Sequence, residues 1–151
     1  EENAANAPKV ARDERKKQAN KVANQRPKTE AETRFLIDEQ LRMVGWEADT
    51  ENIRYSKGVR PTKGRKLAIA EYPTNSTVGN RGYADYALFI GEKLVGIIEA
   101  KAIHKDIPSV IDYQGKDYPR CIREEDEKYV IGKWGEFKVP FTFATNGRPY
   151  L

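Results

Sequence analysis

Asp85, Glu99 and Lys101 are the residues whose types and spacing suit them to catalyse a reaction. Asp85 opens an apolar run that ends at Ile90, and Glu99 closes a second one that begins at Leu94. Two carboxylates that face each other in buried strands repel one another unless a cation joins them. Mg²⁺ suits this position because it binds carboxylates, waters and phosphate oxygens. A neighbouring lysine can orient or deprotonate the attacking water, so the trio predicts a phosphodiesterase-like site.

The turn over residues 91–93 decides whether the two carboxylates meet. If this three-residue turn is centred on Glu92, residues at equal distances from it pair, and Asp85 and Glu99 each lie seven positions away. Paired residues share a face of the sheet, and Lys101, two positions beyond Glu99, points to that face as well. The alternative is an ordinary surface ion pair at the ends of two strands. The strongly apolar flanks favour the metal-binding interpretation.

The elements that must position this hairpin follow an α/β pattern. Thr29 and Glu32 have the spacing of a capping box, and Gly45 is a typical end for the helix predicted over residues 30–44. Strands are predicted over residues 67–72, 83–90 and 94–101, a short helix over 109–118, and a buried strand over 139–144. The acidic run 124–127 is expected to be exposed. This order predicts a mixed central sheet flanked by helices.

Composition excludes several classes of protein. The 151 residues fit one domain, and 38% hydrophobic with 33% charged residues is typical of a folded chain rather than a disordered one. One cysteine and one histidine permit neither an internal disulfide nor a zinc cluster. No apolar run approaches 18 residues, and no leader peptide is recognisable. We therefore expect a soluble cytoplasmic chain that does not act at a membrane.

The net charge of +4 is unevenly distributed. Residues 1–28 hold eight Lys or Arg and four Asp or Glu, whereas residues 29–151 hold 19 of each. Within the neutral part, a run without any acidic residue contains Arg54, Lys57, Arg60, Lys63, Arg65 and Lys66. Such a run favours contacts with DNA phosphates, and a solvated loop is the alternative.

Asp85 followed by Glu99-Ala100-Lys101 resembles the Asp…Glu-x-Lys signature of the restriction-endonuclease-like superfamily. Gln114 and Tyr118 resemble the Gln-x-x-x-Tyr motif of its RecB-like branch. Further matching segments are Glu32-Thr33-Arg34, Gly45-Trp46, 68–73, 82–89 and 143–147. Together they make residues 29–151 similar to the N-terminal nuclease domain of the R (motor) subunit of type I restriction enzymes. Ala84 departs from the proline in the superfamily name, and Pro119 predicts that the helix ends or kinks at Tyr118.

The resemblance implies a restriction-endonuclease-like core and a Mg²⁺-dependent DNA endonuclease without sequence specificity of its own. Asp85 and Glu99 would bind the metal with the backbone carbonyl of Ala100, and Lys101 would support the attacking water. The superfamily often adds a carboxylate from the first helix. Glu32 is the candidate, and Glu39 lies on the same stripe, so helical geometry does not choose between them.

The implied roles of Gln114 and Tyr118 are contacts with DNA or with the metal–lysine site, and an ordinary helix surface pair is the alternative. Residues 1–28 are expected to be a helix or a linker, and residues 29–151 the nuclease domain of a longer chain. Its downstream part would be a helicase-like motor that uses ATP. The implied partners are double-stranded DNA and the methyltransferase and specificity subunits, in a prokaryotic cytoplasm. Two alternatives are a standalone repair or recombination nuclease of the same superfamily and a catalytically silent DNA-binding domain.

Overall fold

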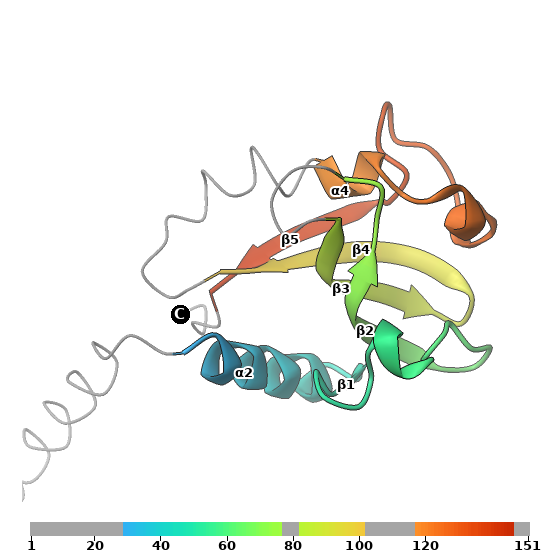
Figure 1. Cartoon of the computed structure of the whole chain (residues 1–151). Helices are drawn as coiled ribbons and strands as arrows, with labels where there is room; N and C mark the ends of the chain where they lie inside the picture. Colours follow the sequence, from blue (N-terminus) through green and yellow to red (C-terminus); the bar gives the residue numbers. More distant parts are fainter. Residues whose placement is uncertain (1–28, 77–81, 102–116, 147–151) are drawn as a thin grey trace, which may run out of the picture.

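A five-stranded mixed sheet forms the centre of the computed structural model, which describes residues 29–76, 82–101 and 117–146 (Figure 1). The strands lie in chain order: β1 (Glu47–Ala48), β2 (Lys66–Pro73), β3 (Tyr83–Ile90), β4 (Lys93–Ala100) and β5 (Phe141–Thr145). β2, β3 and β4 are antiparallel, whereas β1 and β5 pair in parallel at the two edges. The helical elements are α2 (Glu30–Met43), η1 (Tyr55–Lys57), α4 (Asp117–Arg120) and η3 (Glu124–Tyr129). The predicted α/β class is confirmed.

Helix α2 forms almost as predicted and lies along one face of the sheet (Figure 1). The Thr29 hydroxyl accepts from the Glu32 N–H, and the Glu32 carboxylate accepts from the Thr29 N–H, which completes the capping box. Gly45, with φ 89°, supplies the left-handed residue that follows the helix. Ile37 and Leu41 bury the inner side of the helix against β2, β3 and β4.

The opposite face of the sheet is covered by η1 and by residues 117–139, which include α4 and η3 (Figure 1). Tyr118, Ile122 and Val139 are buried there against the core side chains of the three central strands. Tyr72 and Phe89 add an aromatic contact with ring centroids 5.2 Å apart. The sheet is therefore covered on both faces, so the ends of β3 and β4 lie between two packed layers.

The β3–β4 hairpin reaches the predicted pairing by a different route. Lys93 already belongs to β4 and pairs with Ile90, so the turn has two residues and the predicted three-residue turn is wrong. A bulge then leaves Val95 as one extra residue on β4. The shorter turn and the extra residue shift the register in opposite directions and cancel. The register beyond the bulge therefore aligns Asp85 with Glu99, as predicted.

Side-chain alternation breaks in β2 at Glu71. Its neighbours Ala70 and Tyr72 both pair with β3, yet they belong to hydrophobic clusters on opposite faces of the sheet. Residues two apart in a regular strand face the same way, so the strand changes face between them. Glu71 has φ 48°, a left-handed conformation that costs a residue with a side chain about 1–3 kcal/mol. This strained residue lies across from Asp85 in the strand register.

One prediction about burial is wrong and a second holds only in part. The last strand was predicted to be buried, but β5 is an edge strand of the described sheet, and Phe141 and Phe143 stack along it with 59% and 48% of their surface exposed. The acidic run was predicted to be exposed, which holds for Glu124, Glu125 and Glu127, whereas Asp126 is buried. A hydrogen bond from the Tyr72 hydroxyl at 2.8 Å and an ion pair with Arg123 compensate for the burial of this carboxylate.

Only the end of the helix predicted over residues 109–118 falls within the described residues. There α4 spans Asp117–Arg120 and includes Pro119, so an end at Tyr118 is not observed, and the alternative of a kink stays a prediction. Tyr118 is fully buried rather than part of a surface pair. None of the helices in the described ranges combines the length and the apolar character that a membrane span requires.

The core of the hairpin predicts a clear contrast between two adjacent residues. Phe89→Ala removes a fully buried ring that contacts Tyr72 and Tyr129, so we expect the free energy of unfolding to fall by about 3–5 kcal/mol. Ile90→Ala changes the next, half-exposed residue and should cost about 1 kcal/mol or less. Urea denaturation measures both, and equal losses would contradict this description of the core.

Candidate functional site

Asp85 and Glu99 meet at the ends of β3 and β4, and both are almost completely buried, with 3% and 0% of their surface exposed. The Asp85 N–H donates to Glu99 Oε1 at 3.4 Å, and the Ala100 N–H donates to Asp85 Oδ2 at 2.7 Å. Backbone groups thus hold one oxygen of each carboxylate. The apolar strands on either side keep water away from the pair, so the neighbouring side chains determine its charge.

Lys101 follows directly after β4 and joins the carboxylates as predicted. Its Nζ lies 3.5 Å from Glu99 Oε2, and 14% of its side chain is exposed. The Lys101 N–H donates to the Thr145 carbonyl of β5, which fixes the backbone at this point. Glu99 Oε2 is buried and has no hydrogen-bond partner among the described residues, so the ion pair with Lys101 compensates for its burial.

Arg34 completes the group, and the sequence reasoning missed its role. Its Nη2 lies 2.8 Å from Asp85 Oδ1, and its Nη1 lies 3.5 Å from Glu71 Oε1. The signal was present in the helical spacing, because Arg34 lies on the same stripe of α2 as Ile37 and Leu41, which are buried. A charged residue on a core-facing stripe is rarely buried unless it is paired.

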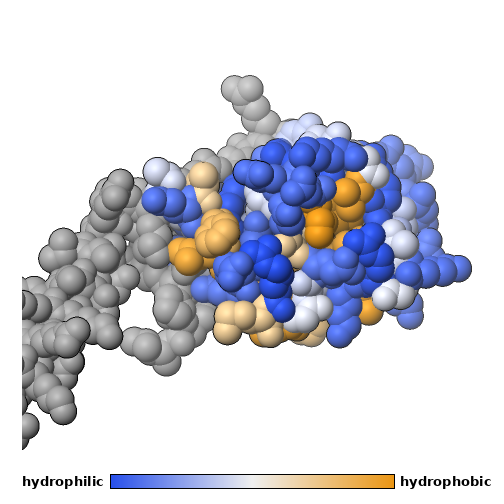
Figure 2. Space-filling view, turned by 90° about the horizontal axis from the view of Figure 1, so that it is seen from below, coloured by the Kyte–Doolittle hydropathy of each residue, from blue (hydrophilic) through white to orange (hydrophobic). Residues whose placement is uncertain are grey.

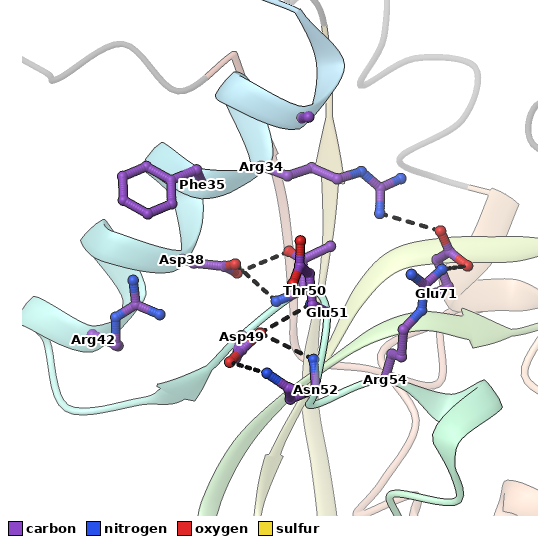
Figure 3. A pocket seen from close by; sticks show the side chains of 11 residues that line it. Arg34, Phe35, Asp38, Arg42, Asp49, Thr50, Glu51, Asn52, Arg54 and Glu71 are labelled. Atoms are coloured by element: carbon purple, nitrogen blue, oxygen red, sulfur yellow. Dashed lines mark hydrogen bonds and ion pairs between the residues drawn. The ribbon is translucent and has the colours of Figure 1, made fainter.

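Glu71 links this group to a cavity of about 710 Å³ beside α2. Figure 3 shows Arg34 and Arg54 reaching Glu71 from opposite sides, one from the helix and the other from the loop after β1. The other residues that line the cavity are Ala31, Phe35, Asp38, Arg42, Asp49, Thr50, Glu51 and Asn52. The buried carboxylates therefore connect through one arginine to an open space whose lining residues are mostly charged or polar.

Burial dominates the electrostatics of the two carboxylates. It raises the pKa of Asp85 above its ordinary value, although the positive charge of Arg34 opposes this shift. Burial and then the negative charge of Asp85 raise the pKa of Glu99 to about 8, against the opposing effect of Lys101. Without an added cation, the pair therefore tends to retain a proton at neutral pH.

The donor set fits a hard divalent cation in its chemistry. Two buried carboxylates converge, and Glu99 Oε2 lacks a hydrogen bond, as expected of an oxygen that awaits a cation. No group of three His, Cys, Asp or Glu able to hold a metal occurs in the described part of the chain. Ala100 contacts Asp85 through its N–H, and the role of its carbonyl stays a prediction.

The helix carboxylate is not found beside the pair. Glu32 is exposed and bonds to Thr29 in the capping box, and Glu39 is exposed and forms an ion pair with Arg42. A metal-binding role for either residue stays a prediction. Gln114 lies outside the described residues, and the buried position of Tyr118 leaves its supporting role a prediction as well.

The basic run divides between the two ends of the sheet. Arg54 lies near the carboxylates, since it pairs with Glu71, whereas Lys63 contacts Glu92 in the hairpin turn. The other basic residues of the run are Lys57, Arg60, Arg65 and Lys66, all exposed. From Asp85 to the turn, β3 spans roughly 17 Å. Seen from the α2 side, the described surface is mainly hydrophilic, with separate hydrophobic patches (Figure 2).

Comparison with known proteins gives two matches. Residues 47–151 match the family described as "Type I restriction enzyme EcoKI endonuclease subunit second domain". The chain is also 38% identical over 147 residues to the Type I restriction enzyme EcoKI endonuclease subunit of Escherichia coli (strain K12). That alignment covers 81% of this chain and 12% of the relative, so the chain spans a small part of it. No solved structure gives a significant match.

The raised pKa of Glu99 predicts that the protein without added cations loses stability as the pH rises. The ordinary value is 4.5 and the folded value about 8, so between them the folded state holds a proton that the unfolded state releases. This contribution is complete below the lower value and disappears above the higher one, with a slope of at most about 1.4 kcal/mol per pH unit. Urea denaturation in EDTA from pH 5 to 8 measures it.

Glu99→Gln should flatten this slope and make the protein more stable than the wild type at pH 8. Glu92→Gln, the same replacement in the exposed turn, should leave the slope unchanged. A slope that survives Glu99→Gln would contradict the assignment.

Proposed function

This chain belongs to the family of type I restriction enzyme endonuclease subunits, and we propose that it forms their Mg²⁺-dependent DNA-cleaving domain. The observation that carries the proposal is the buried Asp85–Glu99 pair with Lys101 beside it. In this proposal the domain hydrolyses phosphodiester bonds and has no sequence specificity of its own. The family assignment favours this function over that of a standalone repair nuclease.

In the proposed reaction, Asp85, Glu99 and the carbonyl of Ala100 would hold Mg²⁺. A cation bound there would supply polarisation of the scissile phosphate and a bound water of lowered pKa. The fit rests on the hard oxygen donors and on Glu99 Oε2, which among the described residues accepts no hydrogen bond and has only the ion pair with Lys101. Because the folded pair tends to keep a proton, metal binding has to release it, and binding should strengthen with rising pH.

The chain's own groups orient the reactants. The Ala100 N–H fixes Asp85 through Oδ2, and the Asp85 N–H holds Glu99 through Oε1, so one oxygen of each carboxylate faces its cationic neighbour. The Lys101 ammonium, 3.5 Å from Glu99 Oε2, is placed to donate to a phosphate oxygen or to orient the attacking water. Its position in a low-dielectric environment strengthens both interactions.

The proposed partners follow from the family. Double-stranded DNA is the substrate, and the methyltransferase and specificity subunits of a restriction-modification complex supply target recognition. A helicase-like motor region, the part of the subunit that uses ATP, would belong to the same longer chain. These remain proposals, because the alignment covers only 12% of the relative.

Substitution of the three active-site residues tests the proposal. In the natural full-length subunit with its partners, Asp85→Asn, Glu99→Gln and Lys101→Met should each lower the rate of Mg²⁺-dependent DNA cleavage about 100-fold or more. Glu47→Gln, a matched change of an exposed carboxylate that pairs with Arg65, should cleave at the wild-type rate. Plasmid cleavage followed on gels measures these rates.

Equal cleavage by the wild type and the three variants would overturn the assigned site. The catalytically silent alternative predicts another result, in which the wild type binds DNA as tightly as the variants but cleaves none with Mg²⁺.

The basic run has its own test, because phosphate contacts make binding depend on salt. Neutralising Lys57, Lys63 and Lys66 together should reduce the slope of log affinity against log salt by about 0.9 for each phosphate that these lysines pair with in the wild type. Lys128→Gln with Lys133→Gln, at exposed positions elsewhere, should leave the slope unchanged. Fluorescence anisotropy of DNA binding at several salt concentrations measures this slope. Equal slopes for the wild type, the triple variant and the double variant would show that the basic run is a solvated loop.

A further inference from the structure

Arg34 holds the oxygen of Asp85 that the backbone leaves unoccupied. Asp85 Oδ2 accepts from the Ala100 N–H, and Oδ1 accepts from Arg34 Nη2 at 2.8 Å. The side chains of Arg34 and Asp85 are 12% and 4% exposed, so this pair is largely removed from water. A cation that approaches Oδ1 therefore meets a guanidinium already bound there.

The charges around Asp85 and Glu99 also oppose the binding of a divalent cation while all the cationic side chains stay in place. Three carboxylates, Glu71, Asp85 and Glu99, each form an ion pair with one or two of three cationic side chains. The cationic members are Arg34, Arg54 and Lys101. With all three carboxylates ionised the group is neutral, and a divalent cation would then leave two uncompensated positive charges in a poorly solvated place. One cationic side chain has to move away when the metal binds.

Arg34 is the cationic side chain that already has a second carboxylate within reach. Its Nη1 is already 3.5 Å from Glu71 Oε1, and Glu71 borders the cavity of about 710 Å³ beside α2. In Figure 3 the Arg34 guanidinium points toward Glu71, and both residues line that cavity. A small rotation of the Arg34 side chain can thus exchange Asp85 for Glu71 as its partner. The guanidinium would stay paired, and the new partner is a carboxylate whose side chain is 38% exposed to solvent.

Glu71 is held for this exchange by an unusual backbone. It adopts the left-handed φ of 48° within β2, and the same residue marks the change of face in the strand. Strain of this kind persists in proteins where the surrounding structure enforces it, and it clusters at functional sites. Here it accompanies a carboxylate that forms ion pairs with both Arg34 and Arg54.

We propose that Arg34 is a positioning residue that neutralises Asp85 in the metal-free protein and transfers to Glu71 when a divalent cation binds. The proposal rests on the proposed function, because it requires a cation between Asp85 and Glu99. It makes Arg34 a competitor of the metal and Glu71 the acceptor that permits the metal to enter. The two residues thus have opposite effects on metal affinity.

Calorimetric titration of the chain with Mg²⁺ tests this pair of opposite effects. Arg34→Met should bind Mg²⁺ about tenfold more tightly than the wild type, because Asp85 loses its competing cation. Glu71→Gln should bind more weakly, because Arg34 loses its second partner. In the double variant the effect of Glu71→Gln should vanish. Glu47→Gln, whose partner Arg65 belongs to the far part of the basic run, should bind as the wild type does.

Thermal unfolding in EDTA and in saturating Mg²⁺ distinguishes competition between Arg34 and the metal from a merely structural role of Arg34. Arg34→Met should melt lower than the wild type in EDTA and regain most of the difference with Mg²⁺, and Arg34→Lys should fall between them. Should Arg34→Met fail to fold, Glu71→Gln still decides, because its partly exposed side chain can be replaced without opening the core.

The outcomes separate the two proposals. If the wild type binds Mg²⁺ and Arg34→Met binds it equally or more weakly, or Glu71→Gln binds it equally or more tightly, the exchange is overturned while the metal site stands. If the wild type binds no Mg²⁺ at all, both the metal site and the exchange are overturned.

Discussion

Burial of two carboxylates at the ends of β3 and β4 is the constraint on which the rest of this structure depends. Asp85 and Glu99 lie where an uncompensated charge is costly, so each must keep a proton or find a cation. The fold supplies one cation to each, Arg34 from α2 and Lys101 from the end of β4. The packing of α2 and the register of the hairpin therefore determine both the core and the site. A shift in either would leave a buried carboxylate without its cationic partner.

The hairpin and α2 were predictable because their signals are local. A capping box, a glycine after the helix and two apolar runs around a short turn need no knowledge of distant residues. The alignment of Asp85 with Glu99 was predicted correctly from a turn that is one residue too long. The bulge at Val95 compensates for that error. Bulges depend on how a strand packs against its neighbours, which a turn pattern does not record.

The remaining parts of the site depend on contacts between distant segments. Arg34 and Asp85 are separated by 51 positions, and the sequence alone does not choose that partner among its 23 acidic residues. Glu71 carries no signal for a left-handed conformation, because glycine and asparagine are the usual residues there. Asp126 was misjudged for the same reason, since its partner Tyr72 lies 54 positions away. The sequence shows that a buried charged residue needs an oppositely charged partner, but the partner is known only once the fold brings the two residues together.

The two ends of the sheet constrain how a duplex can lie on the domain. The carboxylates occupy one end of β3, whereas Lys63 and the hairpin turn occupy the other, roughly 17 Å away. If the domain cleaves DNA as proposed, a duplex whose axis runs along β3 could contact both ends. Successive phosphates of one strand are about 3.4 Å apart along the axis, so the lysines would then reach phosphates about five nucleotides from the cleaved bond. Contacts with phosphates carry no sequence information, so they would suit the proposed cleavage without sequence specificity.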